Sequence, residues 1–185
     1  MKPAALLVTL GICAAAAAPA RAAGAGEFEA AARVGIGVVN QGDHPWGLAG
    51  GLDFGYGLTD AWGISATVQG STAGVSADKA AGVAAGSERS VAALAGLTYT
   101  VDVLRLVPYA SVQLGVAELS GPLAPTVTML ATALALGGDY YVTRQLRAGI
   151  MFQYLFRPQD LFSDPENLGS SPFTFSTTAR LSWIF

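Results

Sequence analysis

The sequence predicts an all-β protein: an eight-stranded antiparallel up-and-down transmembrane β-barrel. The stretch 173–185 alternates apolar and polar side chains throughout, which is the period of a strand with two unlike faces. Seven further stretches alternate in the same way. After the N-terminal segment no eighteen consecutive residues are apolar, although only 12% of the chain is charged. A chain this hydrophobic that lacks spanning helices can cross a membrane as a closed barrel.

The N-terminal segment resembles a secretory signal. Lys2 precedes an apolar run over 4–18, and the small-residue pattern Ala20-Arg21-Ala22 follows it. The run is too short and too rich in alanine for a spanning helix. We therefore expect residues 1–22 to be a cleaved signal peptide and residues 23–185 to form one barrel domain.

Cysteine and charge exclude several functions. Cys13 is the only cysteine and lies in the leader behind Ile12, where a lipoprotein signal would have a small residue. The mature chain therefore offers no disulfide, thiolate metal site or cysteine nucleophile. With Lys2 and Arg21 removed, eight basic side chains face 13 acidic ones, a balance that does not favour nucleic acid as a partner.

The alternation predicts eight strands and seven connections. The strands are expected at 28–39, 48–58, 62–69, 90–101, 107–117, 126–141, 146–156 and 173–185. The stretch 126–141 would also suit a helix, and we favour a strand because its neighbours are strands. Connections after the second, fourth and sixth strands are short and the others tend to be longer, with 71–89 expected as a loop. Short periplasmic turns and long outer loops predict a Gram-negative-type outer membrane with both termini periplasmic.

If the apolar faces look outward, the polar faces meet inside the barrel. Six charged residues share the inward parity: Glu29, Arg33, Asp53, Asp139, Arg147 and Arg180. Three acids balance three bases, as burial of charge requires. They could form a polar gate or ion path, or a plug of salt bridges. The plug is favoured because side chains nearly fill an eight-stranded barrel.

Aromatic residues fall where a membrane interface would place them. A periplasmic belt is expected from Trp62, Tyr140, Trp183 and Phe185, and an outer belt from Trp46, Phe156, Phe173 and Phe162.

Catalytic and metal-binding patterns are weak. His44 is the only histidine, and no serine or carboxylate can be placed beside it by spacing. Asp160, Asp164 and Glu166 could attract a divalent cation, but a solvated acidic loop is the favoured interpretation. We predict no enzyme, no cofactor and no metal site.

The leader, the eight strands and the ending Leu181-Ser-Trp183-Ile-Phe185 resemble the small outer-membrane barrels of the OmpA/OmpX/OmpW type. The phrases Gly57-Leu-Thr-Asp-Ala-Trp-Gly63 and Asp139-Tyr-Tyr-Val-Thr-Arg-Gln145 are similar to the short periplasmic turns of that family. The resemblance implies that Leu181, Trp183 and Phe185 form the signal read by the barrel-assembly machinery.

Function is predicted at the level of class. We expect an integral outer-membrane barrel, in contact with outer-membrane lipid, with a structural, adhesive or surface-interaction role. A narrow channel for small or hydrophobic solutes is the alternative, favoured by inward glycines such as Gly55 and Gly149. A soluble lipocalin-like carrier, with its apolar faces inside, is a third possibility.

Deleting Phe185, or replacing it with a charged residue, is expected to lower the amount of folded barrel in outer membranes, because the assembly signal is lost. Fractionation followed by a gel shift on heating measures this yield. An unchanged yield would show that Phe185 is not part of the signal.

Overall fold

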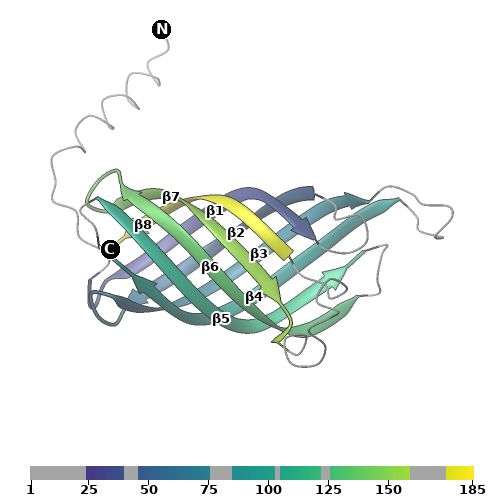
Figure 1. Ribbon diagram of the computed structural model, residues 1–185, viewed down its shortest axis with the longest axis horizontal. Helices are drawn as coiled ribbons and strands as arrows, with labels where there is room; N and C mark the ends of the chain where they lie inside the picture. Colours follow the sequence, from purple (N-terminus) through teal and green to yellow (C-terminus); the bar gives the residue numbers. More distant parts are fainter. Residues whose placement is uncertain (1–23, 40–45, 76–84, 103–104, 122–125, 159–173) are drawn as a thin grey trace, which may run out of the picture.

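The chain forms a closed barrel of eight antiparallel strands, each hydrogen-bonded to its neighbours in sequence (Figure 1). The computed structural model describes residues 24–39, 46–75, 85–102, 105–121, 126–158 and 174–185. The strands are β1 (Phe28–Val39), β2 (Trp46–Gly57), β3 (Trp62–Val75), β4 (Gly86–Thr100), β5 (Leu106–Ser120), β6 (Val127–Tyr141), β7 (Leu146–Phe156) and β8 (Thr174–Ile184). The predicted fold class is confirmed, and the ambiguous sixth segment is a strand.

The barrel closes between the first and last strands. Residues of β1 pair with residues of β8 from Glu29↔Ile184 to Val39↔Thr174. Beyond the ladder, Phe28 N–H donates to the Phe185 carbonyl (2.9 Å), and Phe185 N–H donates to the Phe28 carbonyl (3.0 Å). The two rings lie 6.2 Å apart and nearly parallel. Closure leaves neither strand with an unpaired edge.

The outer wall is apolar. Thirty large hydrophobic side chains of the described residues are exposed, Val34, Leu48 and Leu136 among them at 63–66%. In a lipocalin-like carrier these faces would point inward, so this arrangement contradicts the soluble alternative. Strand parity alone accounts for the result, because successive side chains of a strand point to opposite faces.

Connections differ in length at the two ends. Residues 58–61, 101–105 and 142–145 join strands at what we call the short-turn end, where the C-terminus also lies (Figure 1). The first and third of these turns share one hydrogen-bond pattern. Thr59 Oγ1 accepts from Trp62 N–H (2.9 Å), and Thr143 Oγ1 accepts from Leu146 N–H (2.9 Å). A threonine in each turn thus satisfies backbone donors that the ladder leaves free.

The third and fourth strands are longer than predicted. The stretch 71–89 was expected to be a loop, but β3 runs to Val75 and β4 begins at Gly86. Their registers continue through Ser71↔Ser90 to Val75↔Gly86. The small, polar residues here carry no strong alternation, so the pairing partner determines the structure.

The lumen is only partly polar. Towards the end opposite the short turns, β4 to β7 direct an apolar cluster inward: Ala92, Leu94, Ala117, Leu119, Ala131, Ala133 and Leu155. The expectation that the polar faces meet inside therefore holds near the short turns, whereas β4 to β7 present an apolar inward face in this half. Glu88 on β4, placed by the sequence in a loop, is also buried, with 1% of its surface exposed.

The aromatic residues at the short-turn end face outward as expected: Trp62, Tyr140, Trp183 and Phe185 are 48–65% exposed. Trp46 is likewise exposed at the opposite end. The expectation for Phe156 was wrong, since it is 9% exposed and its ring packs 5.5 Å from that of Tyr154. Phe162 and Phe173 lie outside the described residues.

No described helix is long and apolar enough to cross a membrane.

Candidate functional site

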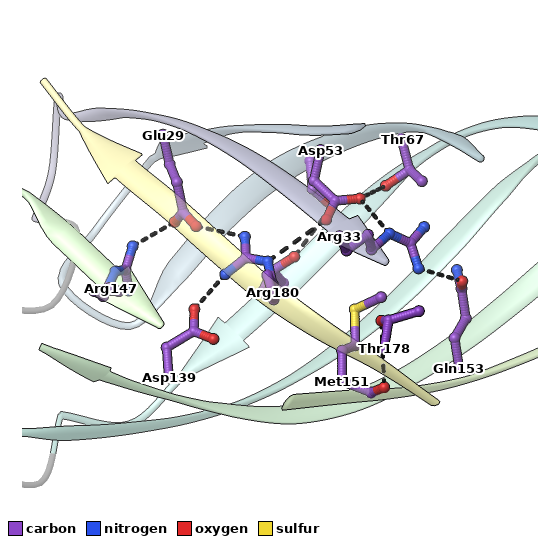
Figure 2. Close-up of polar contacts among 12 residues, drawn as sticks. Glu29, Arg33, Asp53, Thr67, Asp139, Arg147, Met151, Gln153, Thr178 and Arg180 are labelled. Atoms are coloured by element: carbon purple, nitrogen blue, oxygen red, sulfur yellow. Dashed lines mark hydrogen bonds and ion pairs between the residues drawn. The ribbon is translucent and has the colours of Figure 1, made fainter. Parts of the chain in front are cut away.

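All six inward charges predicted from the sequence line the lumen, and ion pairs join them into one cluster (Figure 2). The charge cluster consists of Glu29 and Arg33 from β1, Asp53 from β2, Asp139 from β6, Arg147 from β7 and Arg180 from β8. The side chains are at most 14% exposed. They occupy the short-turn half and the middle of the barrel.

Arg180 is the centre of the charge cluster. Its guanidinium donates to the carboxylates of Glu29 and Asp139, and its Nε lies 3.5 Å from Asp53 Oδ2 (Figure 2). Its Cζ also lies 5.3 Å from the centroid of the Tyr109 ring. One side chain of β8 therefore binds side chains of β1, β2, β5 and β6. An arginine suits this position because its planar group presents five donors in a fixed fork.

Arg33 forms a bar across the lumen. Its Nε lies 3.3 Å from Asp53 Oδ1, and Nη1 donates to Gln153 Oε1 on β7 (2.8 Å). Nη2 donates to the side-chain oxygen of Gln69 on β3. Figure 2 shows Arg33 reaching Asp53 and Gln153 on different parts of the wall. The Arg33 bar is 2% exposed at its side chain and links β2, β3 and β7 across the lumen.

Arg147 completes the cluster near the short turns. It donates to the second oxygen of Glu29, and its Cζ lies 5.4 Å from the Tyr141 ring centroid. Glu29 thus bridges two arginines, one from β7 and one from β8.

Neutral polar side chains extend the network to the rest of the wall. Thr67 Oγ1 donates to Asp53 Oδ1 (2.8 Å). Gln113 Nε2 on β5 donates to Ser65 Oγ (2.9 Å), and Thr98 Oγ1 on β4 donates to the same oxygen (3.1 Å). Gln113 Nε2 also donates to Thr67 Oγ1 (3.1 Å), so every strand of the barrel contributes a side chain to the network.

Burial of these six charges is energetically favourable only when the charge cluster is complete. A buried carboxylate or guanidinium costs several kcal/mol unless it is paired and hydrogen-bonded. Three acids and three bases leave no net charge in the charge cluster, and Arg180 contacts all three acids. Removing one central partner would leave several charges uncompensated.

The space left in the lumen is small. A hollow of about 60 Å³ lies beside the charge cluster and is lined by hydroxyls such as Ser65, Thr67 and Ser111. Another of about 70 Å³ adjoins it towards the short turns, and a third of about 20 Å³ lies on the other side of Arg33. Ligand pockets usually measure about 300–1,000 Å³. These hollows have room for a few waters and not for a ligand.

The remaining sequence candidates have different outcomes. His44, Asp160, Asp164 and Glu166 lie outside the described residues. Within the described part of the chain, no three histidine, cysteine or carboxylate side chains converge as metal ligands would. Of the expected assembly signal, Leu181, Trp183 and Phe185 all face outward on β8 or directly after it.

Sequence reasoning missed the neutral partners of the charge cluster. Gln69, Gln153 and Tyr109 point inward and contact it. Gln113 also points inward and donates to Thr67, which in turn donates to Asp53. Their parity was visible in the sequence. Which of them meet across the lumen depends on strand register and barrel shear, and neither follows from one strand alone.

Comparison with known proteins supports the fold. No protein-family model matches the chain, and no curated protein matches it in sequence. Solved structures match it well. The attachment invasion locus protein Ail of Yersinia pestis is 12% identical, with a TM-score of 0.56, over 87% of this chain and 99% of Ail.

Two further structures agree. Neisserial surface protein A is 16% identical with a TM-score of 0.57, over 86% of this chain and 99% of its own. OprG of Pseudomonas aeruginosa, an outer membrane protein, is 14% identical with a TM-score of 0.57, over 89% and 98%. The chain therefore has the fold of the small eight-stranded outer-membrane β-barrels.

Replacing Arg180 with methionine is expected to destabilise the barrel by about 3–5 kcal/mol, because it leaves the carboxylates of the charge cluster without their central partner. Urea unfolding of the protein folded into phospholipid vesicles measures this. Arg89→Met is the matched control, since Arg89 is exposed on β4, and should change stability by less than about 0.5 kcal/mol. Equal stability of the two variants would contradict a structural role for the cluster.

Proposed function

We propose that the protein is an integral outer-membrane barrel with a closed lumen, which acts through its surface in a structural, adhesive or other interaction role and not as a catalyst. The observation that carries the proposal is the network centred on Arg180, which ties all eight strands together across the lumen. A barrel whose interior is filled and cross-linked offers its outer wall and its loops for function.

The apolar outer wall supports the membrane location. Large hydrophobic side chains cover the outside of every strand, which in water would leave an apolar patch far larger than soluble proteins tolerate. In a bilayer the same wall meets acyl chains, and the closed ladder satisfies the backbone polar groups that lipid cannot. The short turns then face the periplasm together with both ends of the barrel domain.

Two features of the lumen support the proposal that ions cannot pass through it. The Arg33 bar separates the hollows beside the charge cluster from the small one beyond it. Further along, Leu94, Leu119 and Leu155 narrow the interior on the β4 to β7 side. An ion would have to displace a buried arginine to pass.

Adhesion is one form that a surface role could take. Ail, which has the same fold, is named as an attachment and invasion protein. Because identity is low, the likeness makes adhesion a candidate for this chain at the level of fold alone.

A narrow channel is the second candidate, and the hydroxyl-lined hollows favour it. They share Glu29, Asp53, Ser65 and Arg180 among their lining residues and so adjoin each other at the short-turn end. Displacement of the Arg33 bar would be needed to extend this space across the barrel.

Conductance in planar bilayers distinguishes the two candidates. We expect the wild-type protein to insert and to show no steady openings. A channel would open steadily and would be blocked by Gly55→Leu, because Gly55 faces the lumen and an added Cβ would lie 3.6 Å from Glu29 Cβ without clashing. Gly149 is unsuitable, since a Cβ there would lie 2.7 Å from Asp139 Cα.

The matched control is Gly70→Leu on the outer wall, where an added Cβ meets only the Ser90 carbonyl at 3.4 Å. Steady openings in wild type and in Gly70→Leu that disappear in Gly55→Leu would overturn the closed barrel in favour of the channel.

A further inference from the structure

We infer that the outer wall carries a binding site for one anionic phospholipid, with an acyl chain in a groove over β5, β6 and β7 and the headgroup at Arg144 in the turn between β6 and β7. The inference rests on the proposed membrane location. It concerns the outside of the barrel, which the charge cluster does not reach.

The groove is an apolar depression of about 480 Å³ on the outer wall. Its rim consists of Leu106, Leu136, Tyr140, Ile150 and Phe152, all of which are exposed. The Tyr140 hydroxyl is the one side-chain polar group in its lining. Such a surface offers almost no hydrogen bonds, so its occupant must be apolar.

Small residues form the floor of the groove. Gly138 pairs with Ile150 on β7 and with Pro108 on β5, and Tyr140 pairs with Ala148. A Cβ added at Gly138 would meet only Leu106 Cδ1, at 3.9 Å. Because Gly138 lacks a side chain, its larger neighbours stand as walls on both sides. A flexible acyl chain can follow such a groove, whereas a second barrel would need a matching ridge.

Positive charge lies at the short-turn end of the same strands. Arg144 is exposed in the turn between β6 and β7, which begins two residues after Tyr140. Arg144 therefore adjoins the groove end that faces the membrane surface.

The rest of this end is acidic. Glu27 and Asp60 lie near β1 to β3, on other strands than the groove, and Asp102 lies in the turn that also contains Arg105. Among the basic residues in the described parts of the three short turns, only Arg144 is exposed. A negatively charged headgroup is thus attracted to the β5–β7 side, where the groove receives its chain. In Figure 1, β5 and β6 run side by side to the end that holds the C-terminus.

Native mass spectrometry of the detergent-purified protein tests the site, with dioleoyl phosphatidylglycerol and dioleoyl phosphatidylcholine as probes. We expect one molecule of phosphatidylglycerol to be retained in preference to phosphatidylcholine. Arg144→Gln should lower the affinity for phosphatidylglycerol about fivefold, the effect of one arginine near an anionic lipid surface, and leave phosphatidylcholine unchanged.

Gly138→Leu should lower the retention of both lipids at least about fourfold, the factor for one displaced methylene. Gly70→Leu is the matched control on a distant strand and should bind as the wild type does. A gel shift on heating verifies that each variant is folded.

Three results would overturn the inference: equal retention of the two lipids by wild type, retention indifferent to both Arg144→Gln and Gly138→Leu, or a dimer that Gly138→Leu abolishes. The last would show that a second copy covers the groove. A wild-type protein that does not insert into vesicles would instead refute the membrane location, so the two failures can be told apart.

Discussion

The contact of Arg180 with three carboxylates is the interaction on which the rest of the structure depends. Arg180 extends from the last strand and binds Glu29, Asp53 and Asp139 on strands far apart in sequence. Such a buried set is stable only when complete, because each unpaired charge costs several kcal/mol. The network therefore favours one strand register, the register that brings all of its members together, and at the same time fills the lumen.

The inward and outward faces of the wall differ in chemistry. Inward positions near the short turns hold charge, whereas at the other end the inward positions of β4 to β7 hold alanine and leucine such as Ala131 and Leu119. Most outward positions are apolar. Strand closure between Phe28 and Phe185 removes the remaining edge. The charged and the apolar parts of the lumen both oppose an open pore, and we therefore propose that the protein acts through its surface.

Much of this could be predicted from the sequence because strand alternation is a local signal. Residues 28–39 and 146–156 were bounded correctly, and the parity of Asp139 and Arg180 placed them inside. The extension of β3 to Val75 was not predictable, since small residues there pair only because β4 provides partners. Phe156 and the partners of Arg33 were missed because contacts between distant strands depend on register and shear.

The central claim is that Arg180 and its carboxylates stabilise the barrel as a coupled set. A double-mutant cycle with Arg180→Met and Asp139→Asn, measured by urea unfolding in phospholipid vesicles, tests it most directly. Buried, hydrogen-bonded charges should show a coupling energy of about 1.5 kcal/mol or more, so that the double variant is less destabilised than the sum of the single ones. Effects that add to within about 0.5 kcal/mol would contradict the claim.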